Sequence, residues 1–124
     1  MVSVLGDAIA PLIDTAATLG LQALVEVVSL TELDIARRAG ATLVGVNTRD
    51  LHTLAVDPAL AMPVIAEAKR LGMTAVLASG VKSRADVEAA AVAGADAVLV
   101  GETLMRADFP EDVLADLTGV AKRP

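Results

Sequence analysis

Four short apolar runs, separated by stretches with helical periodicity, constrain this chain more than any other feature. The runs cover residues 21–27, 41–47, 73–79 and 95–101. Each is bounded by Gly, Asp, Ser or Asn, as is typical of strands buried on both faces. The helical patterns between them cover residues 31–39, 58–71 and 87–93. Strands that alternate with helices in this way predict βαβ units and a parallel sheet.

The expected helices carry clear start and stop signals. Ser29 with Glu32, and Ser83 with Asp86, have the spacing of a capping box, in which two side chains satisfy the first backbone N–H groups of a helix. A glycine follows each helical stretch shortly before the next expected strand, as is common where a helix ends. These glycines are Gly20, Gly40, Gly72 and Gly94.

An internal repeat supports the same organisation. Residues 29–41 match residues 83–95 at a constant offset, and residues 16–23 match residues 68–75 at a nearly equal one. The repeating unit is therefore two strand–helix modules, present twice. The alternative explanation is that βα proteins in general reuse Ala-Gly-Ala turns, and it leaves the α/β class unchanged.

The residues at the strand ends favour a barrel over an open, doubly wound sheet. The open sheet calls for a G-x-G-x-x-G turn, which this sequence lacks. A barrel instead places functional residues at the carboxyl end of every strand. The expected strands here end in Glu26, Asn47, Ser79-Gly80 and Gly101-Glu102. We therefore predict an α/β fold that forms half of a (β/α)8 TIM barrel, with residues 1–124 as a single half-barrel domain of a leading helix and four βα units.

Charge and composition limit the partners. A formal net charge of −6 argues against nucleic acid, which requires a basic surface. The chain has no cysteine, so disulfides and thiolate metal sites are excluded, and we expect neither a metal ion nor a cofactor. The N-terminus has no basic residue before the apolar stretch, and no uncharged run is long enough for a membrane span. We expect a soluble, cytoplasmic protein that does not bind membranes.

Four ordered motifs resemble those of the indole-3-glycerol-phosphate synthase family. They are LVEV (24–27), VGVNTRDL (44–51), LASGVKSRADV (77–87) and AVLVGETLMRA (97–107). The likeness covers about residues 6 to 118 and corresponds to the last half of that family's barrel. It implies an enzyme of tryptophan biosynthesis, a carboxy-lyase that closes the indole ring of a phosphorylated substrate.

The resemblance implies two catalytic roles. Glu26 matches the glutamate that acts as general base, and its alternative is a glutamate that caps a helix or loop. Asn47 matches the asparagine that orients the hydroxyl groups of the substrate, and its alternative is a simple turn residue.

The resemblance also implies a site for the substrate phosphate, or for free phosphate or sulfate. Ser79, Gly80, Gly101 and Glu102 match the loops after the seventh and eighth strands. There a glycine lets the backbone approach an anion closely, and the following helix presents N–H groups to it. Arg49 is a further candidate contact to the substrate, although we favour a structural ion pair with Asp50.

Several residues of the family pattern are absent from these 124 residues. The family's catalytic lysines, a second glutamate and the aromatic residues of its ring pocket belong to the first half of the barrel, and Lys69, Lys82 and Lys122 do not match them. Ala78 stands where the family commonly has a glutamate. We therefore expect the chain alone to be incomplete for catalysis. The alternative is a non-catalytic, phosphate-binding or self-assembling half-barrel module; VGVNTRDL argues against a different phosphate-binding barrel.

A half-barrel leaves one face of its sheet and two strand edges open. We expect aliphatic residues such as Val25, Val44 and Val98 to meet water on that face. The chain should therefore pair with a partner, either as a homodimer or with a complementing N-terminal half-barrel.

Overall fold

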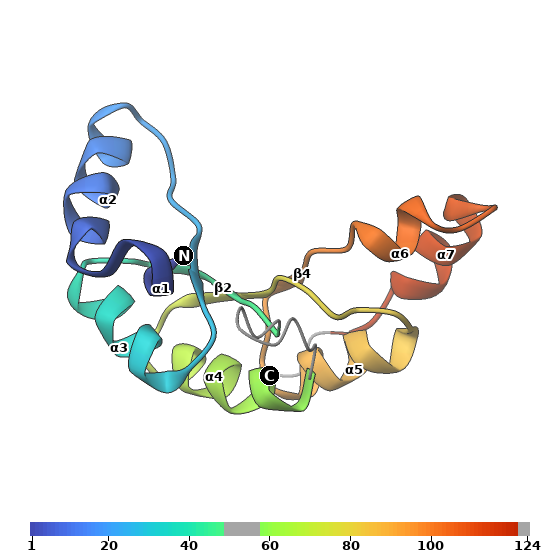
Figure 1. Cartoon of the computed structure of the whole chain (residues 1–124). Helices are drawn as coiled ribbons and strands as arrows, with labels where there is room; N and C mark the ends of the chain where they lie inside the picture. The colour runs from blue at the N-terminus through green and yellow to red at the C-terminus, as the bar shows by residue number, and fades with distance from the viewer. Residues whose placement is uncertain (49–57, 122–124) are drawn as a thin grey trace.

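A computed structural model gives the fold of the chain and describes residues 1–48 and 58–121. Short helices and strands alternate along it, as the sequence predicts (Figure 1). The helices are α1 (Val2–Leu5), the 3-10 helix η1 (Gly6–Ala8), α2 (Ile9–Thr18), α3 (Leu30–Arg38), α4 (Pro58–Arg70), α5 (Arg84–Val92), α6 (Glu102–Met105) and α7 (Pro110–Leu117). The strands are β1 (Val25–Val27), β2 (Leu43–Val46), β3 (Thr74–Leu77) and β4 (Ala97–Val98).

The four strands form one parallel sheet in the order β1-β2-β3-β4. Helices α3, α4 and α5 cover one of its faces, which lies at the bottom of Figure 1. The opposite face is bordered by α2 at one end and by α6 and α7 at the other (Figure 1). Sequential parallel strands with helices on a single side are the arrangement of a half TIM barrel, so the predicted fold class is confirmed.

The observed strands are shorter than the seven-residue runs that predict them. The central strands β2 and β3 have four paired residues each, whereas the outer strands β1 and β4 have three and two. The outer strands have a neighbour on one side only, so fewer of their backbone groups enter the ladder. The rest of each apolar run forms the connection to the strand or the loop that leaves it.

The predicted helix boundaries are confirmed by their hydrogen bonds. Ser29 Oγ accepts the backbone N–H of Glu32 at 3.2 Å, which caps α3. The four predicted glycines Gly20, Gly40, Gly72 and Gly94 each have a positive φ and the paired bonds of a Schellman motif. The repeat is reproduced here, because Ala41 N–H donates to Ala36 O and Ala95 N–H donates to Ala90 O, at 3.0 and 2.9 Å.

The core lies between the sheet and helices α3, α4 and α5. Its largest fully buried side chains come from the strands and from the helix faces above them: Leu33, Ile65, Leu77, Val27, Val44 and Val46. Val25 is also buried there, and Val98 packs against the same core. The prediction that Val25, Val44 and Val98 meet water on the open face is therefore wrong. Side chains alternate along a strand, so a Glu26 on the open face puts Val25 on the helix-covered face.

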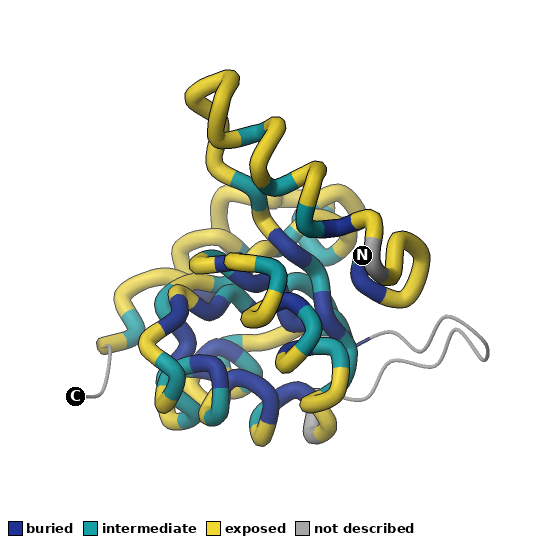
Figure 2. The backbone as a smooth tube through the Cα atoms, turned by 90° about the vertical axis from the view of Figure 1, so that its left-hand side faces the viewer, coloured by how far each residue is buried: buried dark blue, intermediate teal, exposed yellow. Residues whose placement is uncertain are grey.

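The side chains on the open face instead come from the alternate positions of each strand, such as Leu24 and Glu26 around Val25. Leu24 and Leu99, which flank β1 and β4, are both exposed large apolar side chains. Helix α2 projects from the body of the molecule and is exposed along most of its length, together with the loop that follows it (Figure 2). Exposed apolar side chains thus gather at the two ends of the sheet, on α1, α2 and residues 19–24 at one end and on residues 99–114 at the other.

Candidate functional site

Glu26 lies on the open face of the sheet, in the middle of β1. It is paired in register with Gly45 of β2. A Cβ atom at Gly45 would lie 3.5 Å from Glu26 Cγ and 3.4 Å from Ala78 Cβ. Glu26 and Ala78 therefore flank Gly45 on the open face, at distances of ordinary van der Waals contact.

The alternative role for Glu26, capping the helix that follows, is filled by other residues. Ser29 caps α3, and Glu32 Oε2 accepts the backbone N–H of Val28 at 3.0 Å. Within residues 1–48 and 58–121, the Glu26 carboxylate makes no hydrogen bond and no ion pair. A carboxylate held between Val25 and Val27 without a structural partner is one available to a ligand.

The ends of β2 and β3 are joined by a network of side chains around Ser79. Ser79 Oγ donates to Asn47 Oδ1 at 2.7 Å and accepts the backbone N–H of Thr48 at 2.9 Å. It also lies 2.8 Å from Thr48 Oγ1. Asn47 N–H in turn donates to Val27 O at the end of β1. Through these bonds the carboxyl ends of three strands are held at one edge.

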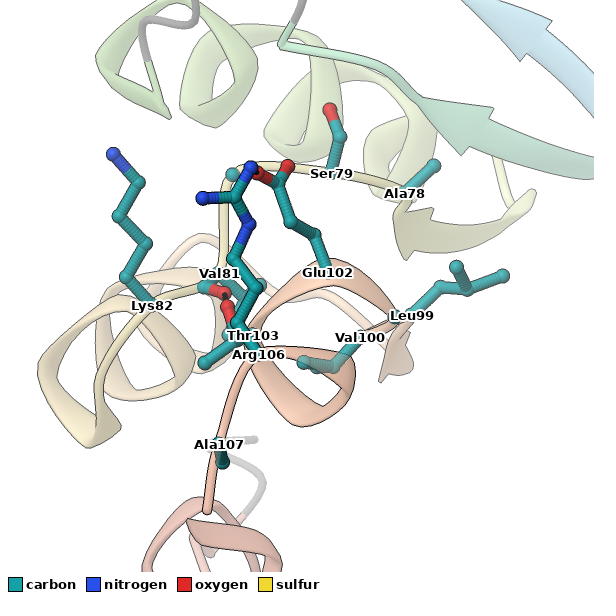
Figure 3. Close-up of a pocket in the computed structure, with 12 residues that line it drawn as sticks. Ala78, Ser79, Val81, Lys82, Leu99, Val100, Glu102, Thr103, Arg106 and Ala107 are labelled. Carbon is teal, nitrogen blue, oxygen red and sulfur yellow. Dashed lines mark hydrogen bonds and ion pairs between the residues drawn. The ribbon is translucent and has the colours of Figure 1, made fainter. Parts of the chain in front are cut away.

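A cavity of about 600 Å³ opens between the loops that follow β3 and β4. Ser79, Gly80, Gly101 and Glu102 all line it, together with Lys82 and Arg106 (Figure 3). The two loops are tied together, because Thr103 Oγ1 donates to Val81 O at 2.6 Å. The arrangement brings two glycine-bearing loops from consecutive βα units to one cavity at the carboxyl edge of the sheet.

The backbone N–H groups around this cavity are not equally available. Asp86 accepts the N–H groups of both Lys82 and Ser83 at 2.9 Å, so the N-terminal turn of α5 is already capped. Partial burial works against ionisation of Asp86, but these hydrogen bonds outweigh it and hold the pKa of the carboxyl below its ordinary value. In the described part of the chain, the N–H groups of Gly80 and Gly101 donate to no protein acceptor. Both glycines line the cavity, so these N–H groups are candidate donors to an anion bound there.

Charged side chains border the same cavity. Arg106 Nη2 lies 3.1 Å from Glu102 Oε1, and both side chains are largely exposed. Figure 3 shows these two side chains next to each other, with Lys82 extending away from the opposite loop. An exposed pair of this kind is weak and is readily exchanged for another partner. The cavity thus has two cations at its border within a chain of net charge −6.

The structure groups the predicted site residues into two neighbouring sets. Ser79, Gly80, Gly101 and Glu102 share the cavity, whereas Glu26 is the central residue of β1 and Asn47 directly follows β2. Ser79 belongs to both sets, since it lines the cavity and bonds to Asn47. Arg49 and Asp50 lie outside the described residues.

Sequence reasoning missed three residues that shape the site: Gly45, Thr48 and Thr103. A glycine inside a buried strand often marks the close approach of a neighbouring group, and this signal could have identified Gly45. No local signal identified Thr48 or Thr103, because their partners come from other βα units.

No helix within residues 1–48 and 58–121 has the length and apolar character of a membrane span. In the same ranges, no group of three or more His, Asp or Glu side chains is arranged to hold a metal ion.

Fold and site together define half of a βα barrel whose predicted site residues lie on the strands or in the loops at their carboxyl ends. Comparison with a crystal structure of the Amycolatopsis orientalis BexX/CysO complex supports the fold, with a TM-score of 0.66 over 87% of this chain and 44% of that one. The sequences are 23% identical, so that likeness concerns the fold alone.

The sequence comparisons are more specific. The family model for indole-3-glycerol phosphate synthase matches residues 1–117. The indole-3-glycerol phosphate synthase of Mycobacteroides abscessus is 44% identical over 117 residues, which is 94% of this chain and 43% of that protein. The protein of the same name from Rhodococcus jostii is 44% identical over 118 residues, covering 95% of this chain and 44% of that protein. The chain belongs to the indole-3-glycerol phosphate synthase family, and it spans less than half the length of these relatives.

Proposed function

We propose that this chain supplies the C-terminal half of an indole-3-glycerol phosphate synthase barrel, and with it the end that anchors the substrate phosphate. The reaction would be the decarboxylating ring closure of carboxyphenylamino-deoxyribulose phosphate, in tryptophan biosynthesis. A phosphorylated substrate does not cross membranes freely, so we place this reaction in the cytoplasm.

One observation carries the proposal: the cavity between the β3 and β4 loops, with the Gly80 and Gly101 N–H groups at its wall. Backbone N–H groups without protein acceptors suit a phosphate oxygen, and glycine lets the anion approach them. Helix α6 is only four residues long, so its dipole adds little. The proposed anchor therefore relies on N–H groups and on the nearby Lys82 and Arg106.

Glu26 and Asn47 are the proposed catalytic residues. Glu26 would act as general base during ring closure and dehydration, because its carboxylate has no structural partner within the described ranges. Asn47 would orient the hydroxyl groups of the substrate. The 124 residues contain no match to the family's catalytic lysines, so we expect no detectable turnover by this chain alone.

The open face supports a requirement for a partner. Leu24 and Leu99 lie at its two ends, and large apolar side chains gather around each. Burial of such surface is the main driving force for association. We propose that the face is covered by a complementing N-terminal half-barrel or by a second copy of the chain.

The anchor is tested by thermal unfolding in inorganic phosphate. For a Kd of about 1 mM, 10 mM phosphate should add about 1.4 kcal/mol of stability. For a domain of this size that gain raises Tm by roughly 5 °C. Sodium chloride at matched ionic strength is the control for screening of surface charge. Equal shifts in phosphate and chloride would refute the anchor.

Gly101→Ala locates the binding. The φ of Gly101 lies outside the left-handed region, and a Cβ there meets no atom within 4 Å. The variant should therefore fold with unchanged stability in chloride. Because Gly101 lines the cavity, the added methyl group should weaken the protection by phosphate at least severalfold. The exposed Arg38→Gln serves as the matched control and should keep full protection.

A further inference from the structure

Thr48 is the one buried polar residue in the described part of the chain, with 5% of its surface exposed. It follows Asn47 directly and contacts Ser79, which is 31 positions further along the sequence. A polar side chain is buried at little cost only where its hydrogen bonds are made. The partner of Thr48 is itself the partner of Asn47, so the three residues form one network.

The direction of the hydrogen bonds in this network follows from counting protons. A serine hydroxyl has one hydrogen to donate and two lone pairs that accept. The hydrogen of Ser79 goes to Asn47 Oδ1, and one lone pair accepts the Thr48 N–H. The contact of 2.8 Å between the two hydroxyls must then use the hydrogen of Thr48. Ser79 Oγ is thereby saturated, so its side chain has no hydrogen left for a phosphate oxygen.

The network fixes which way the Asn47 amide points. Its oxygen is held toward Ser79, so the planar amide turns its NH2 group to the other side. Asn47 makes at least one further interaction within the protein, and its nitrogen carries two hydrogens. The amide nitrogen therefore lies on the side away from Ser79, and any substrate group that contacts it must be an oxygen that accepts.

We propose that Thr48 is a positioning residue which, through Ser79, orients the amide of Asn47 toward an acceptor oxygen on the carbon chain of a phosphorylated substrate. This inference rests on the proposed function, in which Asn47 orients the hydroxyl groups of a substrate whose phosphate is held in the cavity. Thr48 does not touch the substrate. It acts by completing the hydrogen bonds of Ser79.

The test compares two probes on the isotope-labelled chain by NMR titration. Inorganic phosphate can occupy the anchor alone, whereas glycerol 3-phosphate adds hydroxyl oxygens that, on this proposal, accept from the Asn47 amide. The parent chain should bind glycerol 3-phosphate about fivefold more tightly than phosphate, as expected for one neutral hydrogen bond. The Asn47 side-chain NH2 signals should move with glycerol 3-phosphate and stay in place with phosphate.

Thr48→Val keeps the backbone N–H but removes the hydroxyl. It should abolish the fivefold preference and shift the Asn47 NH2 signals even without ligand, whereas Thr48→Ser should restore both. Ser79→Ala, which removes the centre of the network, should also lose the preference and covers the case in which Thr48→Val does not fold. Thr15→Val removes an exposed hydroxyl on α2, away from both the cavity and the network, so it should keep the preference.

The possible failures are distinguishable. If phosphate does not move the Gly80 and Gly101 N–H signals of the parent chain, the proposed anchor is wrong. If phosphate binds but the preference for glycerol 3-phosphate is absent from the parent, or is equal in the parent and Thr48→Val, the role of Thr48 is refuted.

Discussion

Among the charged residues that the structure describes, Asp96 should cost the most stability when it is replaced, because it joins three segments at the amino end of the sheet. Its carboxylate lies 2.7 Å from Lys69 Nζ at the end of α4 and accepts the N–H of Ala75 in β3 at 2.9 Å. Lys69 Nζ also donates to Met73 O. The side chains of Lys69 and Asp96 are 31% and 19% exposed, so solvent screens this pair less than the other ion pairs of the described residues.

The expected cost follows from these bonds. A hydrogen bond to a charged group contributes about 1.5–3 kcal/mol, and a partner left partly buried without it adds to the loss. Asp96→Ala should therefore lower the free energy of unfolding by about 2.5 kcal/mol, and Tm by roughly 10 °C. Asp96→Asn can still accept the Ala75 N–H, so it should lose about half as much.

Asp34→Ala is the matched control. Asp34 pairs with Arg37 and Arg38 at similar distances of 3.0 and 3.1 Å, but its side chain is 51% exposed. Exposed helical pairs contribute about 0.5 kcal/mol or less. Urea unfolding of the three variants and the parent, at one protein concentration, gives the comparison. Equal losses for Asp96→Ala and Asp34→Ala would refute the reasoning that partial burial and the backbone bond set the cost.

Two further predictions test the capping of α5 and the facing of the strands. Asp86 has a lowered pKa, so its contribution, which solvent screening limits to about 0.5–1 kcal/mol, should be complete above the unfolded-state value of 3.8 and lost as pH falls below it. In urea unfolding at pH 7 and pH 2.5, Asp86→Asn should be less stable than the parent only at pH 7, and a constant difference would contradict this. Leu77→Ala should cost about 3 kcal/mol in the same assay, because Leu77 is 0% exposed. Leu99→Ala, at 51% exposed, should cost less than about 0.5 kcal/mol, and a reversed order would show that the faces are misassigned.

The parts of the fold that depend on local sequence were predictable. Periodicity located the strands and helices, and Gly40 and Gly94 marked helix ends because a Schellman motif needs a residue with positive φ. Val25 of β1 was predicted on the wrong face of the sheet, although the alternation of side chains along a strand was enough to place it. Placing Glu26 on the open face fixes Val25 on the other face by the two-residue period alone.

The site was predictable only in outline. The strand-end residues Glu26, Asn47, Ser79 and Gly101 could be identified from their position after an apolar run. The saturation of Ser79 by Thr48 could not, because it depends on a contact between residues 31 positions apart. The capping box allowed one further prediction. A capping side chain accepts the same N–H groups that an anion would need, so the N–H groups near the start of α5, those of Lys82 and Ser83, could be expected to be occupied.

The most direct test of the proposed function is a fusion of this chain to the first half of the barrel of the Mycobacteroides abscessus relative. That half would supply the family's lysines, and the identity of 44% over the shared region favours a compatible interface. We predict decarboxylating ring closure by the folded fusion, reduced at least about 100-fold by Glu26→Gln. The exposed Glu88→Gln should leave the rate unchanged. A folded fusion without turnover, or one whose turnover survives Glu26→Gln, would contradict the assignment of this chain as the catalytic C-terminal half.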